Sequence, residues 1–489
     1  MKPTIRRSIL RPLFAACALA LSLAFGASEV QAQIAGPGPP NKAFTWAETG
    51  ASGLPKFQDA NAGFGWFLID ENIAIRSVPS YSADPTLEVM VDAPLSGHPT
   101  LQETFLLQLP ANWGSKPVEE RALVIGFHPF SISHKSPFVG STLPTECARR
   151  GWMLLSPLGL SQANFASVAS QDSLDQILTL VNGILQFDRS RVYTVGFSMG
   201  GANALSYAMR KQDPDGLRVA GVVCHTGTMD VMADVASLDP VTGGFVYPLF
   251  GGSTPDQDPF EYLRVTPSRM QGLNTVVATD APVWNLVDVP IYFHVNLMDP
   301  NVDLVQHTRS VEQFLSANGF ETTIDQVVAG VTHKWKTMNM TAALDFIADD
   351  VAPPAAPETA TVFEIFADLE TTYRYTEVLE LDPGVRGRYR ISLPVAGNNT
   401  LGIQEISGIR KLAVEIGPTG LDTQALMRLS TWTTDGQSTE LSLIGVPSAP
   451  TTILVNGLPP AASSYDAATE TLTLEPNASG AFALVEILL

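Results

Sequence analysis

Cysteine is scarce in this chain, with only three among 489 residues. Cys17 lies in an N-terminal apolar stretch, which leaves Cys147 and Cys224 for the rest of the protein. So few cysteines exclude a scaffold held together by many disulfides, and no cysteine–histidine spacing typical of a zinc site occurs. We therefore expect two buried thiols, with a single disulfide as the alternative, and no metal centre.

Basic residues are also few. The chain has 29 lysines and arginines against 49 aspartates and glutamates, which gives a formal net charge of −20. A surface of this charge repels nucleic acids and other polyanions. The composition therefore excludes a nucleic-acid partner and favours neutral or cationic substrates.

Long apolar runs are absent after the N-terminal segment. In the rest of the chain, no uninterrupted apolar stretch reaches the roughly 18 residues that suggest a membrane span. Residues 1–32 combine a basic start, an apolar stretch and a small-residue cleavage site after Ala32, as in a secretory signal peptide. An N-terminal anchor is the alternative. We expect a secreted or periplasmic protein with no membrane segment after signal cleavage.

The chain then divides into segments of different pattern. Residues 33–43 predict a flexible lead-in. The segment 44–350 starts with short β-like runs, and from about residue 121 near-continuous apolar strands alternate with helices, as in a mostly parallel sheet covered by helices on both faces. The stretch 231–286 interrupts this alternation with Pro, Gly, Asp and aromatic residues, and we expect a lid or binding loop there. An irregular excursion without a role is the alternative.

A different pattern begins after this segment. Residues 351–358 form a Pro/Ala linker, which is stiff and extended. Residues 359–489 contain short alternating runs separated by turn signals at regular intervals. This pattern predicts a C-terminal all-β domain of the sandwich type.

The stretch VYTVGFSMGGANALSYAM, residues 192–209, carries the strongest chemical signal. A buried strand turns directly into a helix at Gly-x-Ser-x-Gly, which is the context of a nucleophile elbow. Gly196 and Gly200 allow a close backbone approach, and Ser198 is then held at the tip of a tight turn. The helix that begins at Met199 directs its amides toward the same place, where they can stabilise an oxyanion. A glycine-rich turn with a capping serine is the alternative.

A serine hydroxyl needs a base to act as a nucleophile. Of the seven histidines, only His294, His307 and His333 leave room for an acid between Ser198 and the base, as the order Ser, Asp or Glu, His requires. His294 lies within a predicted buried strand, and His307 falls on a helix, where we expect it at the surface. His333 follows the last apolar strand and is therefore the predicted base.

The acid is expected to follow the strand that precedes the strand of His333. The stretch YFHVNLMDPNVD offers Asp299, directly after the strand, and Asp303, four residues later. Asp299 is better placed to hold an imidazole in one tautomer, whereas Asp303 fits a cap of the next helix. We predict Asp299 and keep Asp303 as the alternative.

Around this elbow the sequence resembles a known family. The stretch FDRSRVYTVGFSMGGANAL is similar to the elbow of α/β-hydrolase-fold esterases, in particular the polyhydroxybutyrate depolymerase and feruloyl esterase group. The stretch VAGVTHKW looks like the family's catalytic-histidine loop. The resemblance extends over about residues 100–350, implies an α/β-hydrolase fold there, and does not reach the C-terminal domain. The residues that match the family's lead into the elbow are Asp188, Arg191, Val192 and Tyr193.

The chain departs from the family pattern at two places. Where the family has His-Gly, this chain has His128 and Pro129, and proline has no amide proton to donate. The first oxyanion donor is then the amide of Phe130, with Ser131 as the alternative, and Met199 supplies the second. The element that carries Asp299 lacks the glycine of the family's His-Gly-x-x-Asp.

These residues predict a serine carboxylic-ester hydrolase that works through an acyl-enzyme, with no cofactor. The substrates considered are small esters, polyesters, and feruloyl or acetyl esters on polysaccharide. The C-terminal domain is a candidate polymer-binding module, and a stabilising or secretion-related domain is the alternative. A serine peptidase of the same fold and a non-enzymatic polymer-binding protein are the alternatives. The predicted substrate-binding residues are Phe245, Tyr247, Phe250, Phe260 and Trp335. Ordinary packing of the four insertion aromatics under the loop is the alternative.

Overall fold

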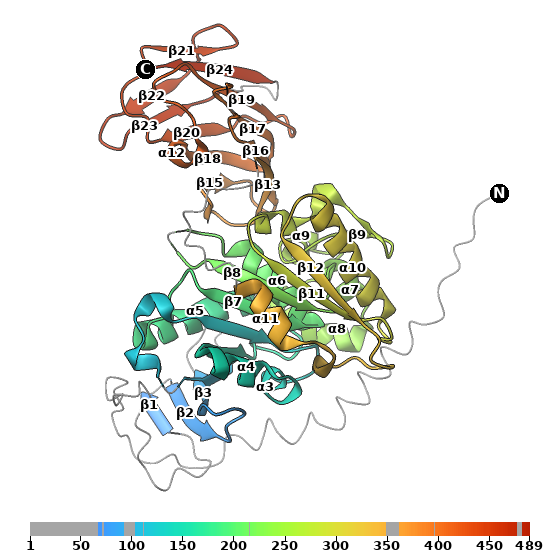
Figure 1. Ribbon diagram of the computed structural model, residues 1–489. Coiled ribbons are helices and arrows are strands. Elements are labelled where there is room, and N and C mark those ends of the chain that lie inside the picture. Colours follow the sequence, from blue (N-terminus) through green and yellow to red (C-terminus); the bar gives the residue numbers. More distant parts are fainter. Residues whose placement is uncertain are drawn as a thin grey trace, which may run out of the picture.

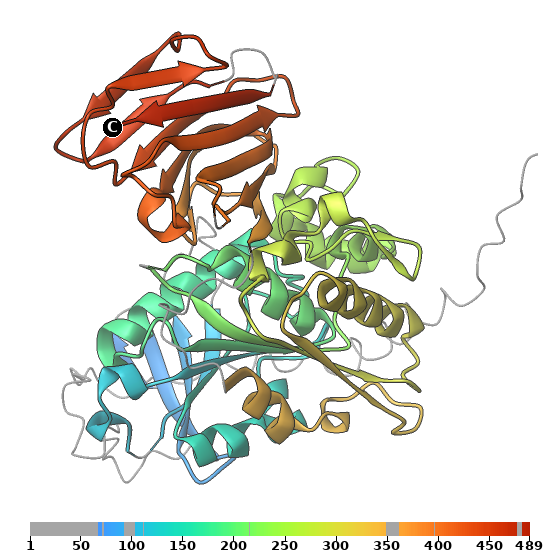
Figure 2. The same ribbon diagram turned by 45° about the horizontal axis from the view of Figure 1, so that its top comes forward.

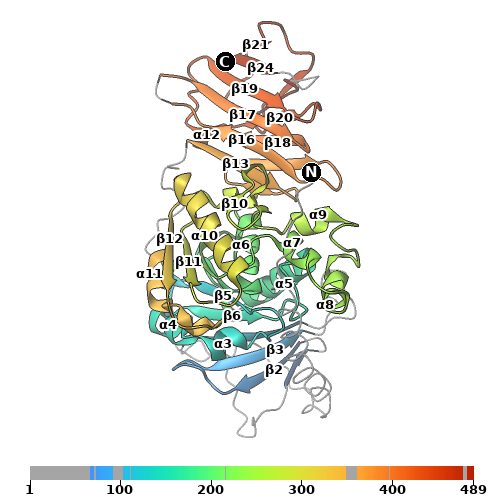
Figure 3. The same ribbon diagram turned by 90° about the vertical axis from the view of Figure 1, so that its right-hand side faces the viewer.

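The computed structural model describes residues 67–70, 73–91, 103–110, 112–214, 216–348, 361–395, 397–476 and 482–489. The predicted signal peptide, lead-in and linker lie outside the described residues. Figure 1 shows two parts, an α/β part and a C-terminal β part, with strands β1–β3 at the end remote from the β part. Figure 3, turned by 90°, shows the same arrangement.

The α/β part is built on one ten-stranded sheet with the order β1-β2-β3-β4-β6-β5-β7-β8-β11-β12. The first four strands are antiparallel, and the neighbours from β6 to β12 run parallel. The carboxyl ends of the parallel strands therefore meet at one edge, where sites of such sheets form. The strands are β1 (Phe67–Asp70), β2 (Ile73–Val78), β3 (Thr86–Val91), β4 (Glu103–Gln108), β5 (Leu123–Phe127), β6 (Met153–Pro157), β7 (Val192–Phe197), β8 (Val219–His225), β11 (Ile291–Asn296) and β12 (Thr322–Val327).

Helices cover both faces of this sheet (Figure 2). The central strands are apolar on both sides, and every residue of β7 is buried, because each face packs against a helical layer. On one face lie α5 (Val168–Leu185), α6 (Met199–Arg210) and α10 (Val302–Ala317). On the other face lie α3 (Ser136–Gly140), α4 (Leu143–Arg150) and α11 (Met340–Ala348).

The 231–286 insertion is more regular than its composition predicts. Two of its helices begin at an Asp-Pro pair, because Asp239 and Asp258 occupy the N-cap position and proline is favoured in the first turn. Residues that signalled a loop in the sequence therefore start helices. The elements are α7 (Val231–Ala236), α8 (Pro240–Val246), η4 (Tyr247–Phe250), α9 (Pro259–Leu263), β9 (Met270–Gln271), β10 (Thr275–Val276), η5 (Ala278–Asp280) and η6 (Pro282–Leu286).

The C-terminal part consists of two six-stranded sheets, as expected for a β-sandwich, and the predicted fold class is confirmed. The strands alternate buried and partly exposed residues, which is the pattern of a sheet with one face on a core. One sheet contains β13 (Val362–Ala367), β16 (Gly387–Ser392), β17 (Thr400–Ser407), β19 (Met427–Thr433), β24 (Ala483–Leu488) and β21 (Thr452–Val455). The other contains β14 (Thr372–Tyr373), β15 (Thr376–Leu381), β18 (Ile409–Glu415), β20 (Glu440–Ile444), β23 (Thr471–Leu474) and β22 (Ser463–Asp466), with the short helix α12 (Ile416–Thr419) between β18 and β19.

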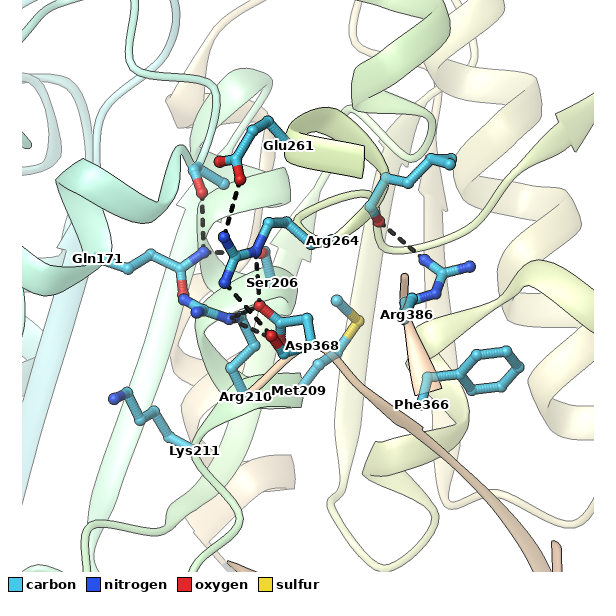
Figure 4. Close-up of polar contacts among 12 residues, drawn as sticks. Gln171, Ser206, Met209, Arg210, Lys211, Glu261, Arg264, Phe366, Asp368 and Arg386 are labelled. Atoms are coloured by element: carbon cyan, nitrogen blue, oxygen red, sulfur yellow. Dashed lines mark hydrogen bonds and ion pairs between the residues drawn. The ribbon is translucent and has the colours of Figure 1, made fainter. Parts of the chain in front are cut away.

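The two parts are joined by buried polar contacts as well as by apolar packing. Asp368 of the β part accepts hydrogen bonds from Arg210, the last residue of α6, and from Arg264 of the insertion (Figure 4). The side chain of Asn285 exchanges two hydrogen bonds of 2.8 Å with the backbone of Phe366. The β part is therefore bound both to α6, which starts directly after Ser198, and to the insertion.

Cys147 lies in α4 and Cys224 in β8, and both are buried and free. The prediction of two buried thiols is therefore confirmed, and the disulfide alternative is wrong. None of the helices in the described part of the chain is long and apolar enough to cross a membrane.

Candidate active site

Ser198 forms the turn between β7 and α6, with φ 58° and ψ −123°. This positive φ is strained for a residue with a Cβ and is typical of functional sites. A Cβ at Gly196 would collide with the carbonyl oxygen of Gly200, and a Cβ at Gly200 would collide with the carbonyl oxygen of Phe127. The glycines of the motif are thus required by the close approach of three backbone segments, as expected for a nucleophile elbow.

The backbone of Ser198 is fixed by the neighbouring strand. Its amide donates to the carbonyl oxygen of His225 at 3.0 Å, and its own carbonyl accepts from the amide of Thr228 at 3.1 Å. The residue is 7% exposed. The turn is therefore held on the end of β8, with little of the serine open to solvent.

His333 and Asp299 come together from loops that follow β12 and β11. The Nδ1 atom of His333 lies 2.6 Å from Oδ2 of Asp299. The other carboxylate oxygen of Asp299 accepts from the amide of Asn301 at 2.9 Å. The imidazole packs against the ring of Phe197, with centroids 4.3 Å apart. The histidine therefore lies against the residue that directly precedes Ser198, with its orientation set by a carboxylate.

Asp303 lies in the first turn of α10, and Asn301 occupies the N-cap position. The interpretation of Asp303 as a helix cap is therefore wrong, because the helix already begins at Val302. Of the two carboxylates considered, only Asp299 contacts His333 in the described hydrogen bonds.

The loop before His333 is held by Asn296, which sequence analysis did not identify. Its Nδ2 donates to the carbonyl oxygens of Gly330 and Thr332, both at 2.9 Å, and its Oδ1 accepts from the amide of Ala329 at 3.0 Å. Asn296 is completely buried at the end of β11. A polar residue that ends an apolar strand was the available signal.

His307 is buried rather than exposed on the surface of α10, so that expectation is wrong. Its Nε2 lies 3.2 Å from the carbonyl oxygen of Gly272, in the turn between β9 and β10. The insertion therefore covers this side of the helix. His294 lies within β11, as expected, and burial lowers the pKa of both histidines.

The loop after β5 reduces the number of backbone amides that can serve as the first oxyanion donor. The amide of Ser131 donates to the carbonyl oxygen of Gln162 at 2.8 Å, which leaves the amide of Phe130 as the first candidate. The close contact of Gly200 with Phe127 places the end of β5 beside the first turn of α6. Phe130 and the start of α6 at Met199 therefore belong to the same edge of the sheet.

A buried carboxylate supports the neighbouring loop at 158–166. Glu103 is completely buried and accepts hydrogen bonds from the amides of Leu158, Gly159 and Leu160 and from the hydroxyl of Ser173. Burial disfavours the charged form and raises the pKa of Glu103 to about 7, although these hydrogen bonds oppose the shift.

The predicted substrate-binding aromatics do not gather at one place. Phe245 is 68% exposed, whereas Phe250 is buried and stacks on Tyr262 with ring centroids 4.1 Å apart. Phe260 packs under the guanidinium of Arg264, near the β part. Phe250 therefore contributes to core packing.

Tyr247 and Trp335 remain, and Tyr247 packs against the same apolar cluster as Phe250. Tyr247 is partly buried in an apolar cluster that also contains Met199. Trp335 is buried, contacts Phe197, and donates from Nε1 to Ser136 at 3.0 Å. The insertion thus covers the start of α6 through this cluster. Trp335 packs against Phe197, the residue that directly precedes Ser198.

Within the described residues, no group of three or more His, Cys, Asp or Glu side chains is arranged to hold a metal ion.

No family model matches the sequence, and no curated protein matches it. The structure is similar to an S-formylglutathione hydrolase from Agrobacterium tumefaciens, with 13% identity and a TM-score of 0.42 over 57% of this chain and 100% of that one. It is also similar to a fluorophosphonate-binding serine hydrolase from Staphylococcus aureus, with 14% identity and a TM-score of 0.39 over 57% of this chain and 100% of that one. A third similar structure is an acetyl xylan esterase from Paenibacillus, with 13% identity and a TM-score of 0.37 over 71% of this chain and 96% of that one. At these values the likeness concerns the fold alone.

Proposed function

We propose that this protein is a serine carboxylic-ester hydrolase with Ser198 as nucleophile, His333 as base and Asp299 as its orienting acid. The proposal is carried by one observation: the imidazole of His333 is hydrogen-bonded to Asp299 and packs against the residue before Ser198. A nucleophile, a base and an orienting group from three strand ends are the parts that acyl transfer requires.

The reaction proceeds in two steps. His333 accepts the proton of the Ser198 hydroxyl through Nε2 as the oxygen attacks the ester carbonyl, while Asp299 stabilises the imidazolium through Nδ1. The amides of Phe130 and Met199 stabilise the negative charge on the carbonyl oxygen. The protonated histidine then donates to the departing alcohol, and water, activated in the same way, releases the acid and restores the serine.

The substrate and location belong to the same proposal. The signal-like residues 1–32 support export, and the β part supports action on polymer-linked esters such as polyester, feruloyl or acetyl esters. The acidic composition favours neutral or cationic substrates. Small, soluble esters are proposed as substrates in addition to the polymer-linked esters.

The decisive experiment compares wild-type protein with Ser198→Ala. We expect a fluorophosphonate probe to label the wild type only, and hydrolysis of p-nitrophenyl butyrate to fall by about 10⁴-fold or more in the variant. Ser190→Ala, at a partly exposed serine before β7, is the matched control and keeps both activities. Labelling or hydrolysis that survives Ser198→Ala would overturn the proposal, and faster cleavage of peptidyl anilides than of esters would identify a peptidase instead.

A further inference from the structure

A row of four side chains crosses the sheet beneath the His333 loop. Phe197 of β7 pairs in register with His225 of β8, which pairs with His294 of β11, which pairs with Asp325 of β12. Residues in register on neighbouring strands project from the same face. The rings of Phe197 and His225 lie 4.5 Å apart, and those of His225 and His294 also 4.5 Å. The four side chains therefore form a continuous floor.

The hydroxyl of Thr337 joins this floor to the loop above it. Its Oγ1 lies 3.1 Å from Nε2 of His225 and 3.2 Å from Nε2 of His294. The Nδ1 atom of His294 lies 3.0 Å from Oδ2 of Asp325. Thr337 ends the 3₁₀ helix η7 (Trp335–Thr337), only four residues after His333. The chain of contacts thus runs from the sheet edge to the segment that carries the base.

The donor and acceptor of each hydrogen bond in this network can be assigned. Burial lowers the pKa of both His225 and His294, so both rings are neutral and each has one N–H. His294 donates from Nδ1 to Asp325, which makes its Nε2 an acceptor for the Thr337 hydroxyl. Thr337 in turn accepts from Nε2 of His225, whose buried Nδ1 has no hydrogen-bond partner within the described residues and carries the lone pair.

A second acceptor competes for the single Thr337 proton. The carbonyl oxygen of Lys334 lies 3.1 Å from the same hydroxyl. Whether that proton goes to Nε2 of His294 or to the carbonyl oxygen of Lys334, the Thr337 oxygen accepts the proton of His225. The bond between His225 and Thr337 is therefore the constant element of the network.

We propose that His225 and Thr337 are positioning residues that set the separation of Ser198 and His333. His225 holds both sides at once, because its carbonyl oxygen accepts the amide of Ser198 and its ring donates to Thr337. Asn296 fixes the residues before His333, and Thr337 fixes the residues after it. This inference rests on the proposed esterase function and adds the residues that align its nucleophile and base.

The alignment matters because displacement of a reacting group by about 1 Å can reduce the rate roughly 10²-fold. Thr337→Val keeps the shape of the side chain and removes the hydroxyl. We expect kcat for p-nitrophenyl butyrate to fall about 10- to 100-fold, with KM within about threefold, and the rate of fluorophosphonate labelling to fall by the same factor. Thr337→Ser, which restores the hydroxyl, is expected to recover most of the rate.

Thr341→Val is the matched control. Thr341 lies four residues further on, and its hydroxyl bonds to Glu146 on α4 instead of to the row. Its removal should leave kcat unchanged. If Thr337→Val does not fold, Asp325→Ala tests the same chain from a partly exposed end, with an expected loss of about 3- to 10-fold in kcat.

The outcomes separate this inference from the function on which it rests. A folded Thr337→Val with kcat within twofold of wild type, or a Thr337→Ser as slow as the valine variant, overturns the positioning role. A Ser198→Ala protein that remains active overturns the esterase itself. An inactive Ser198→Ala combined with unaffected Thr337 variants removes only the inference.

Discussion

Two sets of polar side chains, buried or partly buried, connect distant parts of this chain, and they use opposite chemistry. Beneath the candidate active site, the neutral groups of His225, Thr337 and His294 are hydrogen-bonded in series, and the series ends at the partly exposed carboxylate of Asp325. At the boundary with the β part, Asp368 lies between the guanidinium groups of Arg210 and Arg264, and Arg210 and Asp368 are both buried.

The difference concerns what each set contributes. A neutral hydrogen bond adds about 1 kcal/mol to stability, so the chain under the site mainly fixes geometry. A buried charge without its partner destabilises the fold far more strongly, so the boundary cluster mainly holds two parts together. We therefore expect changes at the site to reduce activity without unfolding, and changes at the boundary to reduce stability without a specific loss of activity.

The largest effect is expected for Asp299→Asn, which tests the first half of this comparison. The amide cannot stabilise an imidazolium and favours the wrong tautomer of His333, so kcat should fall by about 10⁴-fold. The thermal midpoint should change little, because an isosteric side chain remains in place. Asp303→Asn is the control for loss of one negative charge and should keep kcat within about threefold. Equal losses in both variants would contradict the assignment of Asp299.

Asp368→Leu tests the second half. The substitution leaves the buried guanidinium of Arg210 without its carboxylate and removes the link to Arg264, and should lower the free energy of unfolding by about 3–5 kcal/mol. Urea denaturation measures this loss, and kcat per folded molecule should stay within about threefold. Asp382→Leu breaks the more exposed pair with Arg410 in the β part and should lower the free energy of unfolding by no more than about 1 kcal/mol. Similar losses in the two variants would mean that the buried cluster around Asp368 stabilises the protein no more than the more exposed pair of Asp382 and Arg410.

The sequence predicts those features that depend on local patterns. The parallel sheet follows from apolar runs alternating with helices, and the elbow follows from glycines at 196 and 200 beside Ser198. The order of the motif residues along the chain also leads to Asp299 and His333. Each of these inferences needs only neighbouring residues or chain order.

The features that sequence analysis missed depend on contacts between distant segments. His307 looked exposed because its covering turn at Gly272 lies 35 residues away in the chain. The Asp-Pro pairs looked like turns because packing, rather than composition, decides whether a short helix persists. The roles of Asn296 and Thr337 require strand register and loop positions that no local pattern contains.

Glu103 offers a third case beside the neutral and the charged cluster, because it is a buried carboxyl that is bonded only to amides and a hydroxyl in the described contacts. Its pKa in the folded state, about 7, lies above the usual 4.5, so the folded protein binds this proton more tightly than the unfolded chain does. The associated stability is complete below about pH 4.5 and is lost as the pH rises through 7. Glu103→Gln has no such proton to lose.

Urea denaturation of wild type and Glu103→Gln between pH 4.5 and 8 measures this term. The free energy of unfolding of the wild type should decrease relative to the variant by up to about 3 kcal/mol as the pH rises. Glu119→Gln, at an exposed position, controls for the loss of one negative charge. A constant difference between wild type and Glu103→Gln would mean that the amides of residues 158–160 fully offset burial. Glu103 would then behave as a satisfied anion, closer in kind to Asp368 than to the neutral chain beneath His333.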